Sequence, residues 1–370
     1  MKIVYFTHSL ASCWNHGNAH FVRGILSELT LRGHDVLACE PENGWSLSNL
    51  IADHGEAGLA AFRTAYPELR LHSFAADDPL EAMVGDADLV IVHEWNAADL
   101  VAELGRMRRK GAGFTLLFHD THHRAVSAPE QMRAYDLEGY DGVLAFGAAL
   151  AEVYRGWGWG DRAWVWHEAA DTRRFRPRVT DDPPHDLIWI GNWGDGERET
   201  ELETFLLAPA RAANLRLDIY GVRYPPEALE MLGRYGARYH GWAPNAVAPA
   251  LFSQHLATVH VPRRFYAEML PGIPTIRMFE ALACGIPLAS APWEDSEGLF
   301  RAGADYLLAR DGAEMTRHLK LLRHDHALRA QLAANGIETI RARHSCAHRV
   351  DELMTIVEKL RPTLEVRTFA

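Results

Sequence analysis

A regular alternation of short apolar runs with longer amphipathic segments constrains the fold more than any other feature of this chain. In the first half the apolar runs are IVYF, HDVLAC, DLVIVHE, FTLLFHD, GVLAFG and AWVW. In the second half they are DLIWIG, LRLDIYG, ARYHG, LATVHV, IPLAS and DYLLA. Strands that alternate with helices form a parallel sheet with helices on both faces. The pattern therefore predicts an α/β protein.

The chain is long enough for two such domains. It has 370 residues, of which 48% are hydrophobic, and single cores stop growing near ~250–300 residues. Periodicity is lost in HEAADTRRFRPRVTDDPPHD, where proline and charge accumulate. We expect a first domain over 1–168, a linker over 169–185 and a second domain over 186–343. A C-terminal helix over 344–370 is expected to pack back on the first domain.

Composition excludes several classes of protein. The net charge of -11 argues against a nucleic-acid binder, which needs a concentrated basic face. The four cysteines are far apart and form no C-x-x-C pair, so neither a disulfide framework nor a zinc knuckle is expected. MKIVYFTHS is too short an apolar run for a signal peptide, and no stretch approaches the ~18 apolar residues of a membrane span. We expect a cytoplasmic protein, with peripheral membrane contact left open.

Polar residues follow several of the predicted strands of the first domain. His8 follows the first strand, His93 and Glu94 follow DLVIV, and His119 and Asp120 follow FTLLF. Ligands of parallel sheets bind beyond the carboxyl ends of the strands, so these residues are predicted to line one crevice. The aspartates of the D-x-D sequence at 86–88 precede their strand and point away from it.

The loop after the first strand is polar and contains a single glycine. It has no G-x-G-x-x-G, which disfavours a nicotinamide-dependent dehydrogenase. The loop lies at the start of a predicted helix, where backbone N–H groups can bind an anion or a sugar hydroxyl. The candidate residues are Asn15, His16, Gly17, Asn18 and His20. Capping of the following helix by Asn15 or Asn18 is an equally good interpretation.

The stretch PRRFYAEMLPGIPTIRMFEALACGIPLASAPWED, residues 262–295, is predicted to be a basic loop, a helix and a buried strand. The helix is expected from about Thr275 to Cys284, with Ile276 and Phe279 on its core face. Arg277 and Glu280 lie one turn apart on the other face. Taken alone, the pattern favours a local ion pair on a solvated surface.

Three passages resemble the GT-B glycosyltransferases. AADTRRFRP is similar to their crossover linker through Asp171, Thr172, Phe175 and Pro177, and FEALACGIPLAS resembles their donor-site helix. HSCAHRVDELM resembles the end of the CgeB-like branch, named for a spore-maturation protein, through His344, His348 and Arg349. The resemblance implies two Rossmann-like parallel-sheet domains facing a cleft, with C-terminal helices. It also implies a hexosyltransferase-like activity.

The resemblance assigns donor binding to the second domain. The co-substrate would be a UDP-, GDP- or dTDP-linked sugar, with Glu280 on the ribose. The residues implied near the base and its loop are Tyr220, Gly221, His240, Gly241 and Trp242, and Asn192 and Trp193 resemble the turn that approaches the phosphates or the sugar. The family often has a second glutamate with seven residues between it and Glu280, but Gly272 stands there.

Glycosyl transfer leaves negative charge on the departing diphosphate, which the site must stabilise. Arg198, Arg263 and Arg264 follow loops or strands that end at the predicted cleft, and arginine forms paired hydrogen bonds with phosphates. Arg277 belongs to the same donor set. The helix N-terminus at Thr275 would add backbone donors. These groups could take the place of a divalent metal.

Acceptor activation needs a base within reach of a hydroxyl group. The candidates are His119 and Asp120, then Glu94 and His93, and last His16 or His20. In retaining relatives a histidine at the place of His119 supports the donor sugar instead. HDTHH also fits a zinc or iron site, but its spacing is not diagnostic and we expect no metal.

The leading hypothesis is thus a metal-independent glycosyltransferase with an unidentified acceptor. A nucleotide-sugar epimerase of the same fold is one alternative, and it would rearrange the donor without an acceptor. A non-catalytic sugar-nucleotide-binding or surface-assembly protein is the other, because Gly272 replaces the expected glutamate.

Overall fold

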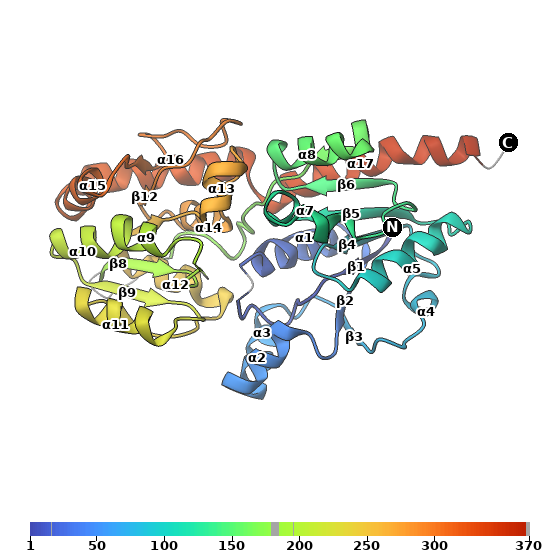
Figure 1. The fold of residues 1–370 in the computed structure, drawn as a ribbon, viewed down its shortest axis with the longest axis horizontal. Helices are drawn as coiled ribbons and strands as arrows, with labels where there is room; N and C mark the ends of the chain where they lie inside the picture. Colours follow the sequence, from blue (N-terminus) through green and yellow to red (C-terminus); the bar gives the residue numbers. More distant parts are fainter. Residues whose placement is uncertain (16, 179–184, 195, 368–370) are drawn as a thin grey trace. The chain divides into compact units, whose positions relative to one another are not determined.

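The chain folds into two compact α/β units, each built on a parallel sheet (Figure 1). The computed structural model describes residues 1–15, 17–178, 185–194 and 196–367, with side chains described through residue 360. Unit 1 comprises Met1–Glu168 and Cys346–Ala370, and unit 2 comprises Ala169–Ser345. The predicted linker therefore falls at the start of unit 2.

Unit 1 contains a seven-stranded sheet in the order β3-β2-β1-β4-β5-β6-β7. All its paired strands are parallel. The strands are β1 (Lys2–Phe6), β2 (Asp35–Pro41), β3 (Leu71–Phe74), β4 (Leu89–His93), β5 (Thr115–Asp120), β6 (Gly142–Ala145) and β7 (Ala163–Val165). From β1 the chain moves outward to β2 and β3, and then returns to place β4 on the other side of β1. The order of strands thus reverses between β1 and β4.

Helices lie on both sides of this sheet (Figure 1). They are α1 (Ala19–Leu31), α2 (Trp45–His54), α3 (Glu56–Ala65), α4 (Leu80–Val84), α5 (Ala98–Arg109), α6 (Arg124–Ser127), α7 (Pro129–Arg133), α8 (Ala148–Tyr154) and α17 (Cys346–Arg367), with the short turns η1 (Arg155–Trp159) and η2 (Gly160–Arg162). In α1 the buried Phe21, Ile25 and Leu29 recur at helical spacing. α1 packs against α17, so the last helix completes the core of the unit that contains the N-terminus.

Unit 2 contains a six-stranded parallel sheet in the order β10-β9-β8-β11-β12-β13. The strands are β8 (His185–Ile190), β9 (Leu217–Tyr220), β10 (Arg238–Tyr239), β11 (His255–His260), β12 (Leu288–Ser290) and β13 (Leu307–Leu308). Here the order of strands reverses between β8 and β11. The comparable point in unit 1 lies between β1 and β4, and such points are where ligands of open α/β sheets bind.

The helices of unit 2 cover both faces of its sheet. They are α9 (Glu199–Leu202), α10 (Ala208–Ala212), α11 (Pro226–Tyr235), α12 (Ala248–Ser253), α13 (Arg264–Met269), α14 (Ile276–Cys284), α15 (Gly312–His324) and α16 (His326–Arg343), with the turns η3 (Glu203–Leu207) and η4 (Asn245–Val247). α10 packs on α15, whereas α14 packs on α12 and α16. Aspartates at 311 and 325 cap α15 and α16, each accepting a hydrogen bond from a backbone N–H in the first turn.

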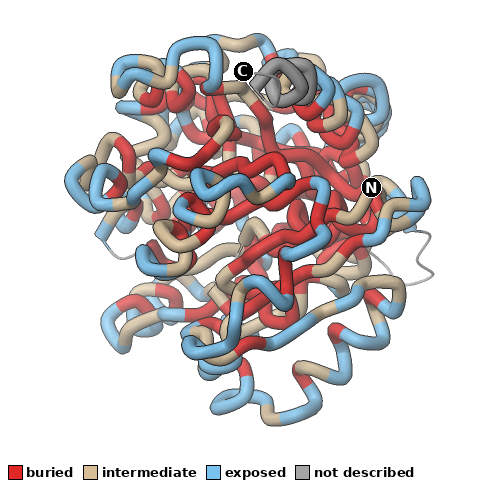
Figure 2. Tube along the Cα trace, turned by 90° about the vertical axis from the view of Figure 1, so that its right-hand side faces the viewer, coloured by how far each residue is buried: buried red, intermediate tan, exposed pale blue. Residues whose placement is uncertain are grey.

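Burial follows the sequence pattern. Every residue of β4 and β5 is buried. Figure 2 shows buried stretches of the chain in the interior and exposed stretches around them. Strands that are covered on both faces have continuous apolar sequences. DLVIVHE and FTLLFHD have such sequences, which is why both are predicted to be buried strands. The predicted fold class, two parallel-sheet α/β domains with C-terminal helices, is confirmed. No helix in the described part of the chain is both long enough and apolar enough to cross a bilayer.

The structure corrects two local predictions in the stretch 262–295. The predicted basic loop contains the helix α13, which is too short to show a clear period. The solvated surface that the pattern of α14 favours when taken alone is not found, because Glu280 is fully buried and every residue from Met278 to Cys284 is buried with it. An ion pair that looked like a surface feature is therefore an interior one.

Candidate functional site

The carboxyl edge of the unit 1 sheet is fixed by the turn that follows β4. Asn96 Nδ2 donates to the carbonyl oxygens of Phe6 (3.0 Å) and His93 (2.8 Å). These bonds tie the end of β4 to the end of β1, where the strand order reverses. The side chains that follow these two strands therefore have defined places.

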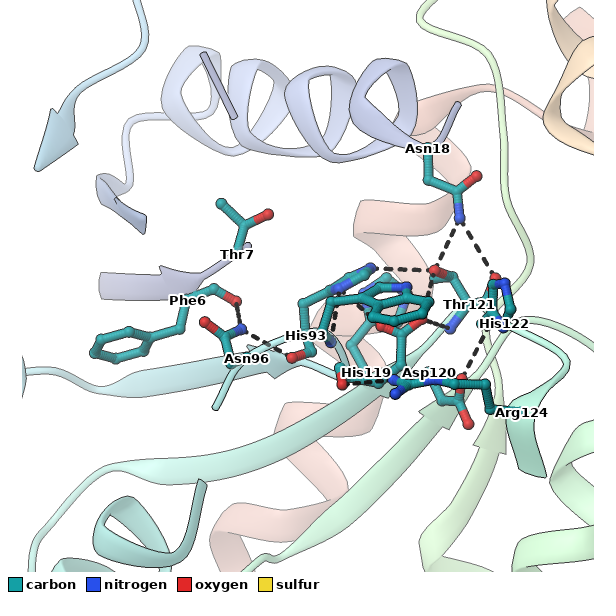
Figure 3. A network of polar contacts seen from close by, with 12 residues as sticks. Phe6, Thr7, Asn18, His93, Asn96, His119, Asp120, Thr121, His122 and Arg124 are labelled. Atoms are coloured by element: carbon teal, nitrogen blue, oxygen red, sulfur yellow. Dashed lines mark hydrogen bonds and ion pairs between the residues drawn. The ribbon is translucent and has the colours of Figure 1, made fainter. Parts of the chain in front are cut away.

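Thr121 is the centre of a buried polar network at this edge (Figure 3). Its N–H and hydroxyl both donate to Glu94 Oε1, each at 3.2 Å. The hydroxyl oxygen lies 3.1 Å from His93 Nε2 and accepts from Asn18 Nδ2 at 2.8 Å. His93 Nδ1 lies 2.8 Å from Glu94 Oε2 and accepts from the Trp95 N–H at 3.4 Å. The contacts of Thr121 therefore hold the Glu94 and His93 side chains in fixed positions.

Asp120 is a second buried carboxyl group in the same place. Its Oδ1 accepts from the His122 N–H at 3.0 Å, and its Oδ2 accepts from the Tyr154 hydroxyl at 2.7 Å. Burial, followed by the nearby charge of Glu94, raises the pKa of Asp120 to about 7. A carboxyl group with this pKa changes its protonation near neutral pH, as general acids and bases do.

His119 is completely enclosed. Its Nδ1 and the Tyr5 hydroxyl are 2.6 Å apart, and its ring packs edge-on against Trp166 at 4.8 Å between centroids. Burial, followed by the charge of His93, lowers the pKa of His119 well below its usual value, so the ring is neutral at pH 7. Its Nε2 is buried and has no hydrogen-bond partner among the described residues.

The structure brings together most of the residues predicted at this edge. Glu94, His93, His119 and Asp120 are all fully buried and lie in one network with the half-buried Asn18. Asn15 adopts a left-handed conformation (φ 51°), and both Asn15 and Gly17 are partly exposed, whereas His20 is buried. Asn18 precedes α1 but makes no side-chain capping bond, which disfavours that interpretation. His16 lies outside the described residues.

In unit 2, Arg198 occupies the point where the strand order reverses. Its Nη2 donates to the carbonyl oxygen of Asn192, just after β8, at 2.6 Å. Its Nη1 donates to the carbonyl oxygen of Val261, just after β11, at 3.2 Å. The guanidinium lies 5.2 Å from the Trp189 ring centroid. Arg198 thus joins the two loops at the carboxyl ends of the central strands.

The charge of Arg198 is not matched by a carboxylate in the described part of the chain. Among the described residues, no carboxylate forms an ion pair with it, and its buried Nε has no hydrogen-bond partner. Burial, followed by the charge of Arg263, lowers the pKa of Arg198 to about 9, which reflects the cost of holding this cation away from water. His260, at the end of β11, is also buried; its pKa is lowered to about 3, so the imidazole beside Arg198 is neutral.

The loops around Arg198 come into close backbone contact. A Cβ added at Gly221 would lie 2.1 Å from the Gly191 carbonyl oxygen, so only glycine fits there. Asn192 Oδ1 accepts from the Val222 N–H at 3.2 Å, which joins the loops after β8 and β9. Trp193 is buried and packs against Tyr224, so its side chain belongs to the core of the unit.

The residues predicted near the nucleoside base also gather beyond β9. The rings of Tyr220 and His240 stack at 4.6 Å between centroids, and the interplanar angle is 13°. His240 Nε2 lies 2.6 Å from Asp218 Oδ1, and the Gly241 carbonyl oxygen accepts from the Gly221 N–H at 2.8 Å. Trp242 follows, half-buried. The stacked pair offers an aromatic face next to the glycine loop.

The other predicted cations of unit 2 each have an acidic partner. Arg263 pairs with Glu197 at 2.8 Å, and Arg264 pairs with Glu201 at 3.1 Å. Arg277 pairs with Glu280, whose Oε1 also accepts from Asn245 Nδ2 at 2.9 Å. Burial raises the pKa of Glu280. Thr275 immediately precedes α14 and makes no side-chain capping bond.

Gly272 stands in a place that glutamate could not occupy without a rearrangement. Its φ is +88°, and an added Cβ would lie 2.7 Å from Ser296 Oγ and 2.9 Å from Glu297 Oε1. The backbone conformation of this loop therefore favours glycine at position 272, where the family often has glutamate.

Sequence reasoning missed several residues of these edges. Tyr154 holds Asp120 from α8, and Asn245 holds Glu280 from η4, but neither lies in a recognisable motif. Trp95 and Arg124 were also missed, although Trp95 directly follows the singled-out Glu94. Among the described residues, no group of three or more His, Cys, Asp or Glu side chains is arranged to hold a metal ion.

The fold identifies a class: two parallel-sheet α/β units of this kind make up the GT-B architecture of glycosyltransferases. Residues 198–355 match the family model described as "Glycosyl transferase-like", in agreement with the enzyme class expected from the sequence. No curated protein sequence matches the chain.

Solved structures share this fold at low sequence identity. The Anabaena protein Alr3699/HepE, solved with UDP and glucose, is 14% identical with a TM-score of 0.67, covering 99% of both chains. A glycosyltransferase from Rickettsia africae is 10% identical with a TM-score of 0.66, covering 97% of this chain and 98% of that one. Sucrose-phosphate synthase from Thermosynechococcus elongatus is 14% identical with a TM-score of 0.66, covering 98% and 100%.

Proposed function

We propose that the protein transfers a sugar from a nucleoside-diphosphate sugar to an acceptor hydroxyl group. The observation that carries this proposal is Arg198, a buried guanidinium at the strand-order reversal of unit 2 that pairs with no described carboxylate. The departing diphosphate gains negative charge in the transition state. A rigid cation already held by two backbone carbonyls can meet that charge without reorganising.

The other donor contacts follow from the same edge of unit 2. The Tyr220–His240 pair gives the base an aromatic face, and the glycines at 191 and 221 let the backbone approach the phosphates. Glu280, held by Arg277 and Asn245, is assigned to the ribose hydroxyls. Complexes of a structural neighbour with UDP and with UDP-glucose make UDP-glucose the first donor to test.

Unit 1 is assigned to the acceptor and to proton transfer. Asp120, Glu94 and His119 are the acid–base candidates, and the near-neutral pKa of Asp120 supports that role. His93 and the polar loop with Asn15, Gly17 and Asn18 are assigned to sugar or acceptor hydroxyls; His16 and His20 complete that set by sequence alone.

Metal independence is part of the proposal, because the guanidinium groups supply the positive charge that a divalent ion would bring. We assign the chain to the CgeB-like branch on its tail sequence. Two of its residues have structural contacts: the ring of His344 bonds the Leu299 carbonyl at 2.9 Å, and the Arg349 carbonyl accepts from Trp166 Nε1 at 2.8 Å. A cytoplasmic enzyme fits this assignment.

Nucleotide binding by an R198M variant tests the proposal. Methionine matches the arginine side chain as far as Nε and removes the charged guanidinium group. We expect UDP, GDP or dTDP to bind at least ~100-fold more weakly by calorimetry, since charged hydrogen bonds contribute about 1.5–3 kcal/mol each. R310M is the matched control, because Arg310 is exposed and pairs with Glu314. Equal affinities in R198M and the parent would refute the role of Arg198.

Incubation with the donor alone separates transfer from the other reactions of this fold. A transferase leaves the sugar configuration unchanged until an acceptor is added, whereas an epimerase rearranges it. The readout is the anomeric and ring-proton NMR spectrum of the donor.

A further inference from the structure

Trp95 is an exposed aromatic residue in the middle of a buried polar edge. Its side chain is 43% exposed, whereas its neighbours His93 and Glu94 are fully buried. It lies in the turn between β4 and α5, which Asn96 fixes to the end of β1. The ring is thus presented at the strand-order reversal of unit 1 by a rigid turn.

Arg124 covers part of this ring. Its Cζ lies 3.7 Å from the Trp95 ring centroid, and its Nη2 donates to the Glu94 carbonyl oxygen at 2.8 Å. His122 packs edge-on against the same indole at 5.1 Å. Stacking and hydrogen bonding together hold the guanidinium in one orientation, so little side-chain entropy remains to be lost when a ligand binds.

The carboxylates near Arg124 are committed elsewhere. Glu94 faces Thr121 and His93, and Asp120 accepts from His122 and Tyr154. Among the described residues, Arg124 forms no ion pair with any acidic group. The positive charge of Arg124 also affects His8. The pKa of His8 is lowered well below its usual value, first by burial, then by the charge of His93 and then by the charge of Arg124. This edge therefore carries a half-buried cation that forms no ion pair with a described carboxylate, although its charge also lowers the pKa of Asp120, which burial raises.

We propose that Trp95 and Arg124 form an acceptor subsite for a sugar that carries an anionic group. The accessible part of the indole packs against the apolar face of the sugar ring, and the guanidinium binds the anion. This inference rests on the proposed transfer reaction and deepens it by naming the acceptor class. A phosphate and a carboxylate would satisfy the same guanidinium.

Binding of matched sugars to the full-length protein tests the subsite. The probes are methyl glucoside, glucose 6-phosphate and glucuronic acid, measured by ligand-detected NMR titration in the presence of saturating UDP. We expect at least one anionic sugar to bind about tenfold more tightly than the neutral one, the value of a single charge-assisted contact. Comparison of the phosphate and carboxylate arms identifies the anion.

Two variants assign the preference to the proposed side chains. R124Q should bring the affinities of anionic and neutral sugars within twofold, and W95A should weaken all three sugars by a similar factor. R162Q is the matched control, since Arg162 lies 4.8 Å from the Trp159 ring but just before β7, at the amino edge of the sheet. It should behave as the parent does.

The outcomes separate this inference from the proposed function. UDP should bind equally to the parent, R124Q and W95A. If UDP binds but the parent shows no anionic preference, or if R124Q retains that preference, the subsite is refuted and the transferase proposal stands. If the parent binds no nucleoside diphosphate, the proposed function itself fails. Equal affinity of the parent and W95A for glucose 6-phosphate would refute the part played by Trp95.

Discussion

The two sheets have the same plan but opposite electrostatics at their carboxyl edges. In unit 1 the carboxyl groups of Glu94 and Asp120 and two imidazoles are buried close together, each with hydrogen-bond partners of its own. In unit 2 the group at the equivalent reversal of strand order is a buried arginine that donates to two carbonyl oxygens and lies over the Trp189 ring. One edge is built to hold protons, and the other to meet an anion.

Arg198 and Arg124, neither of which pairs with a described carboxylate, show the same contrast at the level of one side chain. Arg198 is buried, and its lowered pKa shows that its charge is costly without a ligand. Arg124 is partly exposed and stacked on Trp95, so water and the ring share its charge. The first is suited to strong, obligatory binding of a diphosphate, and the second to weaker selection among acceptors.

The largest expected effect concerns the pH dependence of unit 1. The pKa of Asp120 is raised from 3.8 to about 7 in the folded state, so its neutral form stabilises the fold below pH 4, and this contribution is lost as pH rises to about 7. In the parent, this contribution changes the free energy of unfolding by on the order of 4 kcal/mol between pH 4 and pH 7, and D120N should remove that change. The measurement is the free energy of unfolding by urea at several pH values. An unchanged slope would contradict the assignment; D99N, at an exposed site in α5, is the control.

The next effect concerns unit 2. E280A removes the acidic partner of Arg277 and leaves a cation beside a buried cavity, so the free energy of unfolding should fall by about 3 kcal/mol. Loss of nucleotide binding in this variant would therefore need a folding control. E230A, on the exposed side of α11, should change stability by less than about 0.5 kcal/mol. Equal stability of the two variants would show that the Glu280 pair is not the interior feature described here.

The smallest effect is expected at Arg264. Its side chain is 42% exposed and pairs with Glu201, and such surface pairs contribute about 0–1 kcal/mol. R264Q should bind UDP within about threefold of the parent, far from the loss expected for R198M. A similar loss in both variants would mean that the uncompensated charge is not what distinguishes Arg198.

Much of the fold could be predicted because its strands are covered on both faces. Continuous apolar runs marked β4, β5, β8 and β11 directly, and the alternation with helices fixed the parallel class. Edge elements were harder. In β3, LHSF, only Phe74 is buried, so the strand carries almost no apolar signal, and α13 is shorter than two helical turns.

In the candidate site, the residues that could be predicted were those that directly follow strands or the loops after them. Polar residues after strands were found because the fold rule places them at one edge, which is why Glu94, Asp120 and Arg198 were singled out. The burial of Glu280 could not be predicted from the sequence of α14, because this helix packs on both α12 and α16 and its polar positions are enclosed as well. Arg124 begins α6, and Trp95 lies in the turn after β4. These two residues are far apart in the sequence, so no local pattern predicts that they stack.

The path of the chain has a consequence for synthesis. Ala170 and Ser345, at the two ends of unit 2, are joined as a parallel bridge, and the Ala170 N–H donates to the His344 carbonyl at 2.9 Å. Unit 2 is thus complete once residue 345 has emerged from the ribosome, whereas the α1 face of unit 1 stays uncovered until α17 is made. Domains fold as units during translation. The half of the protein that is translated first is therefore the half that finishes folding last.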